Sequence, residues 1–238
     1  MAKFGVVVFP GSNCDRDCYY VLKDFLRQSC EYVWHQDTCL DDLDCIIIPG
    51  GFSYGDYLRT GAIARFSPVM GAVKEFAESG KPVIGICNGF QILVESGILQ
   101  GAFIKNSSLK FVCRWTSLLV ENAGTPFTCN LKKGDVIRIP VAHGQGSYYV
   151  SDEQLKTLKG SSQVVFRYCD DTGNVGASDN PNGSVYSIAG TCNSGFNVVG
   201  MMPHPERSYD DIIGGSQGRL IFESVLSWIK SGQLPAQG

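Results

Sequence analysis

Short apolar runs and amphipathic stretches alternate along the first part of the chain. Residues 4–9 and 43–48 are continuous apolar runs of strand length, as expected of strands that a parallel sheet buries on both faces. Apolar side chains also recur at helical spacing, at Cys18, Leu22, Phe25 and Leu26 and again at Val69, Ala72, Val73, Phe76 and Ala77. Ser12 or Asn13 is the expected N-cap of the first of these helices. The succession predicts a doubly wound, mostly parallel sheet of the flavodoxin type, with its site at the carboxyl edge of the strands.

The later part of the chain has a different pattern. Residues 110–120, 135–142 and 164–168 are typical of strands separated by turns, and they predict a mainly antiparallel extension of the same domain. A final helix should pack back onto the sheet through the apolar side chains of Leu220, Ile221, Val225, Trp228 and Ile229. No internal repeat, low-complexity tract or linker is present, so we expect a single domain over residues 1–238.

Composition and charge narrow the classes of function. Of the 238 residues, 44% are hydrophobic and 18% are charged, the usual balance of a soluble globular protein. A net charge of -3 gives no reason to expect nucleic acid or a membrane surface as a partner. The chain has no apolar run near the roughly 20 residues that span a bilayer, and no secretory signal. Its ten cysteines form no C-x-x-C pair, which predicts reduced thiols in a cytoplasmic protein without a metal site.

The candidate chemistry centres on residues 81–93, where an apolar run breaks at Gly85-Ile86-Cys87-Asn88-Gly89 and a helical pattern follows. This G-x-C-x-G pattern is the cysteine form of the nucleophile elbow, a sharp turn that holds the nucleophile in the open. A thiol at a helix N-terminus favours the thiolate, because unpaired N–H groups and the helix dipole stabilise negative charge. The motif alone leaves open the alternative that Cys87 is a small buried hydrophobe.

A catalytic cysteine needs a base, and His204 is the best-placed histidine because it directly follows a buried apolar run. Pro205 should hold His204 extended, and in an extended chain His204 and Glu206 point to the same side. A carboxylate beside an imidazole fixes its tautomer and stabilises its cation. We therefore favour a His204–Glu206 dyad over a surface turn in which Glu206 pairs with Arg207.

The other histidines and the oxyanion donors are less strongly indicated. His35 is typical of a partly exposed imidazole at a strand end, whereas His143 lies in a glycine-rich loop that could present it to a partner or to a site. Acyl transfer also needs donors for an oxyanion. The N–H of Asn88 is one candidate, and the backbone of Gly50-Gly51 is another. A tight turn that needs positive φ would also explain these two glycines.

Taken together, these residues resemble the class I (triad) glutamine amidotransferases, which carry a Gly-Gly loop, a G-x-C-x-G elbow and a late His-Pro-Glu. The resemblance covers nearly the whole chain, and it narrows to the branch that supplies ammonia in purine biosynthesis. Five segments carry it, in order: Phe9-Pro10-Gly11-Ser12-Asn13-Cys14-Asp15, Pro49-Gly50-Gly51-Phe52-Ser53-Tyr54-Gly55-Asp56, Cys87-Asn88-Gly89-Phe90-Gln91, Ala142-His143-Gly144 and Gly200-Met201-Met202-Pro203-His204-Pro205-Glu206-Arg207.

The resemblance implies a role for each residue of the triad. Cys87 would attack the γ-carboxamide carbon of glutamine and form a glutamyl thioester. His204 would protonate the departing ammonia and then activate water, while Glu206 would orient His204. The N–H groups of Gly51 and Asn88 would hold the oxyanion.

It also implies partners, and no cofactor in this chain. Ammonia would pass to a large synthetase subunit, which uses ATP and Mg to convert formylglycinamide ribonucleotide to formylglycinamidine ribonucleotide. A small third subunit would bridge the two. Gln91 would help to bind glutamine, and His143 is a candidate for the synthetase interface. Gln145 stands where the family usually has Glu, which weakens any charge-dependent role of that loop. Cys14 matches a motif position, but the motif implies no base near it, and we interpret Cys14 as structural.

Other classes of function remain as alternatives. A non-catalytic glutaminase-like module would regulate or scaffold the synthetase, although intact Cys87, His204 and Glu206 argue against it. A flavodoxin-like binding module would need a phosphate cradle after the first strand, where residues 10–14 offer a single glycine. Among enzymes, the alternatives are a glutaminase that feeds a different synthetase and a stand-alone γ-glutamyl hydrolase.

Overall fold

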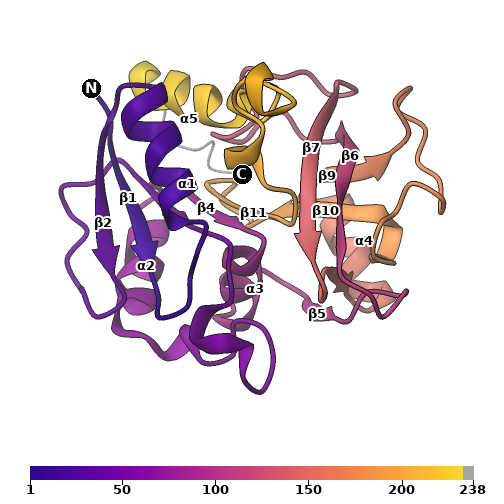
Figure 1. The fold of residues 1–238 in the computed structure, drawn as a ribbon, viewed down its shortest axis with the longest axis horizontal. Coiled ribbons are helices and arrows are strands. Elements are labelled where there is room, and N and C mark those ends of the chain that lie inside the picture. The colour runs from indigo at the N-terminus through magenta and orange to yellow at the C-terminus, as the bar shows by residue number, and fades with distance from the viewer. Residues whose placement is uncertain (233–238) are drawn as a thin grey trace.

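The computed structural model describes residues 1–232, and its core is one nine-stranded sheet (Figure 1). The parallel half of this sheet has the order β2 (Ser29–Trp34), β1 (Lys3–Val8), β3 (Cys45–Ile48), β4 (Val83–Ile86) and β11 (Val198–Met201). Each of these strands pairs in parallel with its neighbours within this half. The predicted doubly wound parallel sheet is confirmed.

The other half of the sheet is antiparallel. It continues beyond β11 in the order β10 (Ile188–Cys192), β9 (Val164–Cys169), β6 (Val112–Val120) and β7 (Val136–His143). In Figure 1 the early, indigo part of the chain forms the left half, and the magenta and orange part forms the right half. A separate two-stranded sheet pairs β5 (Ala102–Ile104) with β8 (Ser147–Tyr149). The predicted antiparallel extension is confirmed.

Five α-helices accompany the sheet in the described part of the chain. They are α1 (Asp15–Tyr20), α2 (Pro68–Glu78), α3 (Asn88–Glu95), α4 (Asp152–Gly160) and α5 (Arg219–Ser231). A π-helical turn, Val21–Phe25, continues α1, and short 3-10 turns occupy Ser53–Asp56, Ala64–Phe66, Val185–Ser187, Pro205–Arg207 and Asp211–Ile213. Within residues 1–232, no helix combines the length and apolar character that crossing a bilayer requires.

The parallel strands place four loops at one edge of the sheet. All residues of β3, β4 and β11 are buried, as expected of strands covered on both faces. Because the strands run in one direction, the loops after β1, β3, β4 and β11 all leave at the carboxyl edge. These loops carry Cys14, Gly51, Cys87 and His204. The topology therefore brings together residues that are far apart in the sequence.

The start of α1 differs from the prediction. Cys14 holds the N-cap position and makes no side-chain capping bond. Ser12 Oγ instead donates to the carbonyl of Phe9, and Asn13 Oδ1 accepts from the Cys14 thiol. The expected cap by Ser12 or Asn13 is wrong, because both side chains serve the turn that precedes the helix.

Candidate active site

The chain turns sharply between β4 and α3, and Cys87 lies at this turn. Its backbone has φ 51° and ψ -105°, a conformation that non-glycine residues rarely adopt. Gly89 permits the close approach to β3, because a Cβ there would overlap the carbonyl oxygen of Ile48. The Cys87 Sγ atom lies 3.8 Å from the carbonyl oxygen of Ala142. The strand, sharp turn and helix predicted for this motif are confirmed.

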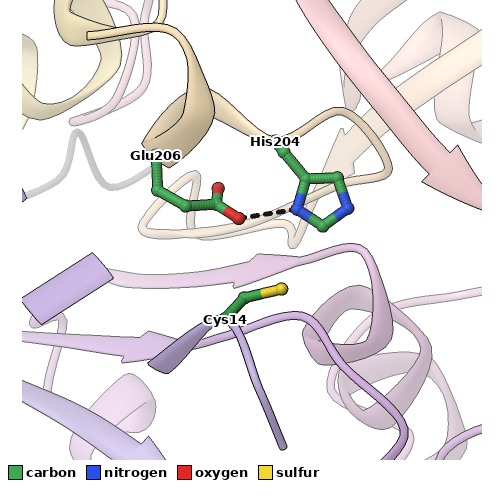
Figure 2. A group of neighbouring side chains, drawn as sticks. All are labelled: Cys14, His204 and Glu206. Atoms are coloured by element: carbon green, nitrogen blue, oxygen red, sulfur yellow. Dashed lines mark hydrogen bonds and ion pairs between the residues drawn. The ribbon is translucent and has the colours of Figure 1, made fainter. Parts of the chain in front are cut away.

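His204 and Glu206 form a buried pair directly after β11. His204 Nδ1 and Glu206 Oε1 are 2.6 Å apart, and the two residues are 2% and 1% exposed (Figure 2). The predicted contact is confirmed, but the chain is not extended through it, because Glu206 lies in the 3-10 turn Pro205–Arg207. Arg207 does not neutralise Glu206 in a surface turn. Its Nε atom lies 3.4 Å from a carboxylate oxygen of Asp17.

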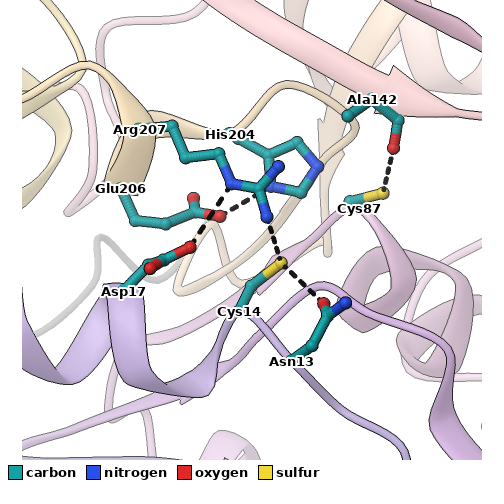
Figure 3. A network of polar contacts seen from close by, with 8 residues as sticks. All are labelled: Asn13, Cys14, Asp17, Cys87, Ala142, His204, Glu206 and Arg207. Atoms are coloured by element: carbon teal, nitrogen blue, oxygen red, sulfur yellow. Dashed lines mark hydrogen bonds and ion pairs between the residues drawn. The ribbon is translucent and has the colours of Figure 1, made fainter. Parts of the chain in front are cut away.

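Burial and charge act in opposite directions on His204. Burial alone would lower its pKa, but the Glu206 carboxylate and, after it, the Cys87 sulfur hold the pKa well above its ordinary value. His204 Nε2 has no hydrogen-bond partner among the described residues. Figure 3 shows this nitrogen on the side of the ring toward Cys87, away from Glu206. The pair can therefore hold a proton on the side of the Cys87 thiol.

A second thiol, that of Cys14, lies beside the same pair (Figures 2 and 3). Arg207 Nη2 donates to Cys14 Sγ at 3.1 Å, and Cys14 Sγ lies 3.2 Å from Asn13 Oδ1. Burial raises the pKa of the Cys14 thiol, although the neighbouring His204 opposes this effect. The motif implied no base near Cys14, but the structure places His204 beside it. Its sequence neighbours gave no sign of His204, because the contact spans the two ends of the chain.

Gly50 provides the space in which the base and both thiols meet. A Cβ at Gly50 would lie 2.8 Å from His204 Cε1, 3.1 Å from Cys14 Sγ and 3.4 Å from Cys87 Cβ. A side chain at this position would push the base and the nucleophile apart.

The same cluster has ligand types that metals use. One ligand atom each from Cys14, His204 and Glu206 lies within 4.8 Å of the others. The Arg207 guanidinium, 3.1 Å from the Cys14 sulfur, places a positive charge where a cation would sit. The 2.6 Å contact between His204 and Glu206 already engages one imidazole nitrogen. The arrangement therefore suits an acid–base pair better than a metal centre.

The two predicted oxyanion donors lie on loops at the same edge of the sheet. Asn88 is the first residue of α3, so its N–H has no carbonyl acceptor within the helix. Gly51 lines the same cavity as Cys87, has φ 137° and forms a short bridge with Ser12. Gly51 can therefore form a turn that needs positive φ and also donate its N–H to an oxyanion. The donor role of both N–H groups stays a prediction.

The Asn88 side chain connects the elbow to the loop after β3. Its Oδ1 accepts from Ser53 Oγ at 2.6 Å, and its Nδ2 donates to Asp56 Oδ1 at 3.1 Å and to Gln91 Oε1 at 3.0 Å. Gln91 Nε2 in turn donates to the carbonyl of Gln145 at 2.6 Å. Gln91 therefore braces the site, and its predicted contact with substrate stays a prediction. Asp56 belongs to one of the motifs that carry the family resemblance, but the sequence indicated no role for it.

His143 is buried at the wall of the cavity, with 4% of its surface exposed. Its Nδ1 lies 3.2 Å from Asn106 Oδ1, and its Nε2 lies 3.4 Å from Asn182 Nδ2. Burial lowers the pKa of His143 to about 4, so the imidazole is neutral. This placement puts His143 in the wall of the site, and its predicted role at the synthetase interface stays a prediction. His35 lies outside the cavity lining, with Nδ1 2.9 Å from the Tyr54 hydroxyl oxygen.

The site opens into a cavity of about 570 Å³. Its volume is in the range of small-molecule pockets. Its lining comes from both halves of the sheet: Asn13, Cys14, Gly51, Phe52, Gly55, Asp56, Thr60, Cys87, Gln91, Phe111, Cys113, Ala142, His143, Gly144, Gln145, His204 and Arg207. Cys87, His204 and Gly51, the predicted nucleophile, base and one of the predicted oxyanion donors, thus line one space.

Comparison with known proteins gives close and extensive matches. The chain is 55% identical to the phosphoribosylformylglycinamidine synthase subunit PurQ of Moorella thermoacetica, over 97% of this chain and 98% of that protein. It is also 55% identical to the subunit of the same name from Salinibacter ruber, over 96% and 97% of the two chains.

Solved structures show the same fold. A chain in the structure of PurLQS from Thermotoga maritima matches with a TM-score of 0.84 and 47% identity, covering 96% of this chain and 99% of that one. A glutamine amidotransferase from Thermotoga maritima, at 15% identity, matches in fold with a TM-score of 0.57 over 97% and 92% of the two chains. The model of the CobB/CobQ-like glutamine amidotransferase domain matches residues 1–223. This chain belongs to the CobB/CobQ-like glutamine amidotransferase family.

Proposed function

We propose that this chain is the glutamine-hydrolysing subunit of a phosphoribosylformylglycinamidine synthase. The observation that carries the proposal is the buried His204–Glu206 pair, whose free Nε2 faces a cysteine at a strained elbow. The extensive identity to PurQ subunits and the match to a chain of PurLQS support the choice of synthetase.

The first half of the reaction forms a thioester. The Cys87 thiolate adds to the γ-carboxamide carbon of glutamine, and the N–H groups of Gly51 and Asn88 hold the resulting oxyanion. The carbon–nitrogen bond then breaks as His204 gives its proton to the departing nitrogen, which leaves as ammonia. Glu206 holds the imidazole in the tautomer that this transfer needs and stabilises its cation.

The second half releases glutamate. Water attacks the thioester carbon while His204, now neutral, takes a proton from it. The carbon–sulfur bond breaks, glutamate leaves, and the Cys87–His204 pair returns to its starting state. Every proton and bond in this cycle is accounted for by the three side chains and water, so we propose no metal or other cofactor in this chain.

The ammonia serves a partner. We propose that it passes to a large synthetase subunit, which uses ATP and Mg to convert formylglycinamide ribonucleotide to formylglycinamidine ribonucleotide in purine biosynthesis. A small bridging subunit completes the complex, and the site of action is the cytoplasm. The match to a chain in the structure of PurLQS supports an assembly of this kind.

An electrophilic glutamine analogue tests the nucleophile. We expect one equivalent of label on Cys87, and Cys87→Ala should abolish both labelling and ammonia release. Cys113→Ala is the matched control, because Cys113 lines the same cavity but is exposed and lies on β6. Glutamine-dependent synthesis by Cys87→Ala mixed with the partner subunits would contradict the assignment.

The choice of synthetase is tested separately. The chain should co-purify with the formylglycinamidine-forming synthetase and raise its glutamine-dependent rate, while other amidating synthetases should gain nothing. Full labelling without that coupling would keep the glutaminase and reject the proposed synthetase. A non-catalytic module would show neither labelling nor ammonia release.

A further inference from the structure

We propose that Asp56 binds the α-ammonium group of glutamine and so selects the amino acid over simpler γ-carboxamides. The proposal rests on the glutaminase function and adds a specificity-determining residue to the same cavity. Asp56 takes no part in the thioester chemistry. If the proposed role of Asp56 were wrong, the glutaminase assignment would therefore stand.

The charges of the cavity point to Asp56. Among the described residues that line it, Asp56 supplies the one carboxylate. Arg207, the one arginine or lysine of the lining, is held on the side of the base by Cys14 and Asp17. A zwitterionic substrate that enters this space therefore meets a single carboxylate that can accept from its ammonium group.

Asp56 is also correctly placed along the cavity. Its Oδ1 accepts from Asn88 Nδ2 at 3.1 Å, and Asn88 directly follows the nucleophile. The carboxylate is thus tied to the elbow with one side chain between them. A glutamine whose γ-carboxamide lies at Cys87 has only a short aliphatic chain before its α-ammonium group, which would bring that group into this neighbourhood.

The backbone at Asp56 is held in an unfavourable conformation. Tyr54, Gly55 and Asp56 have φ values of 55°, 70° and 52°, three left-handed residues in succession. Such conformations cost energy at non-glycine residues, and they concentrate at functional sites. This strained turn places the Asp56 carboxylate in the cavity lining. Two hydrogen bonds from Ser53 to Asn88 connect the turn to the elbow.

Asp56 has no cation to balance its charge. No ion pair forms between Asp56 and a lysine, arginine or histidine of the described residues. Burial raises the pKa of Asp56 to about 6, and the hydrogen bonds from Asn88 and from the Gly61 backbone only partly offset it. A bound ammonium group would stabilise the charged form of this half-buried carboxylate, because it would supply the missing positive charge.

A comparison of two substrates distinguishes binding of the α-ammonium group from reaction at the γ-carboxamide. L-Glutamine and glutaramic acid carry the same γ-carboxamide, but glutaramic acid lacks the α-ammonium group. We expect the wild-type complex to prefer glutamine in kcat/KM by roughly 10- to 100-fold, the value of a charge-assisted contact. Asp56→Asn should reduce this preference to about threefold or less, through the KM for glutamine, and should change the rate with glutaramic acid little.

The control variant is Asp42→Asn, which neutralises an exposed carboxylate outside the cavity and should keep the wild-type preference. If Asp56→Asn lowered kcat/KM equally for both substrates, Asp56 would act only through Asn88 and the proposal would be overturned.

The wild-type enzyme provides a second test that needs no variant. The preference for glutamine should fall as the pH drops below about 6, because Asp56 then becomes neutral while the substrate ammonium stays charged. A preference that stays constant through this pH range would also count against Asp56. If the enzyme released ammonia from neither glutamine nor glutaramic acid, the proposed function itself would be contradicted.

Discussion

His204 lies between two thiols, and only one of them has a part in the proposed chemistry. Cys14 Sγ accepts from Arg207 and contacts the His204 side, while Cys87 stands at the elbow. Cys14 contributes to the raised pKa of His204. We therefore expect Cys14 to act as a positioning residue that helps to keep the imidazole protonated until ammonia leaves.

Replacing Cys14 should change the pH dependence more than the fold. Cys14→Ala removes a thiol that helps to raise the pKa of His204, so this pKa should fall and the alkaline limb of kcat/KM should move to lower pH. We expect a loss of about tenfold in kcat, the order of one lost hydrogen bond or slightly more. The pH profile of ammonia release measures both effects.

Cys14→Ser is the matched variant, because a hydroxyl can accept from Arg207 and hydrogen-bond to His204. It should recover most of the wild-type pH profile. A profile that is the same in wild type and in Cys14→Ala would show that Cys14 only fills space.

The candidate catalytic residues that could be predicted from the sequence are those that lie within a recognisable local motif. Cys87 lies between two glycines, and His204 and Glu206 flank a proline, so local geometry was enough to single them out. Cys14 and Asp56 depend instead on His204, Arg207 and Asn88, each far away in the chain. A local sequence pattern cannot indicate such contacts, so the proximity of Cys14 to His204 and Arg207 was not predicted.

At the scale of elements, the strands with strong apolar runs were predictable and the weak ones were not. The buried apolar runs of β1, β3 and β4 predicted a parallel sheet. β10 contains Gly190, where its register with β9 shifts, so its pattern is irregular. α4 buries only Leu158, and its capping box at Ser151 and Gln154 is its main signal.

The elbow depends on one close contact between elements. A Cβ at Gly89 would overlap the carbonyl oxygen of Ile48, so α3 packs directly on the backbone of β3. Gly89→Ala should push α3 away from β3, destabilise the protein by on the order of 3 kcal/mol and misplace Cys87. Urea unfolding and labelling by the glutamine analogue measure the two effects.

Gly71→Ala provides the comparison within the same fold. Gly71 lies in α2, and an added Cβ there meets nothing within 4 Å. This substitution should stabilise the protein by about 0.5–1 kcal/mol through helix propensity and leave labelling unchanged. Equal stability of both variants would show that the packing of α3 on β3 tolerates a methyl group.

At the scale of the whole molecule, the cavity exists because the sheet has two halves. The loops after β3, β4 and β11 supply Gly51, Cys87 and His204, and the loop after β7 adds Gly144 and Gln145 from the antiparallel half. The extension predicted from residues 110–168 therefore closes the site as well as widening the sheet. The sequence did not predict the order of the strands in the sheet. It therefore could not show that this extension contributes to the cavity.

Ammonia formed in this cavity must leave toward the synthetase, so the partner should cover the cavity mouth. The turn 53–60 borders that mouth, since Gly55, Asp56 and Thr60 line the cavity. The same turn exposes Tyr57 to 74% and Leu58 to 91%. Apolar side chains this exposed, at the edge of a functional cavity, are typical of an interface.

Leu58→Lys should therefore weaken assembly without changing the chemistry. Burial of a leucine stabilises a contact by about 1.5–3 kcal/mol, so the dissociation constant for the partner subunits should rise at least about tenfold. Labelling of Cys87 in the isolated subunit should stay within about twofold of wild type, because Leu58 does not line the cavity. Ile212→Lys, at a residue that is also 91% exposed but lies outside the cavity lining, should leave the dissociation constant unchanged. Equal weakening by both substitutions would indicate a general effect of added charge, and unchanged binding in Leu58→Lys would place the synthetase on another face.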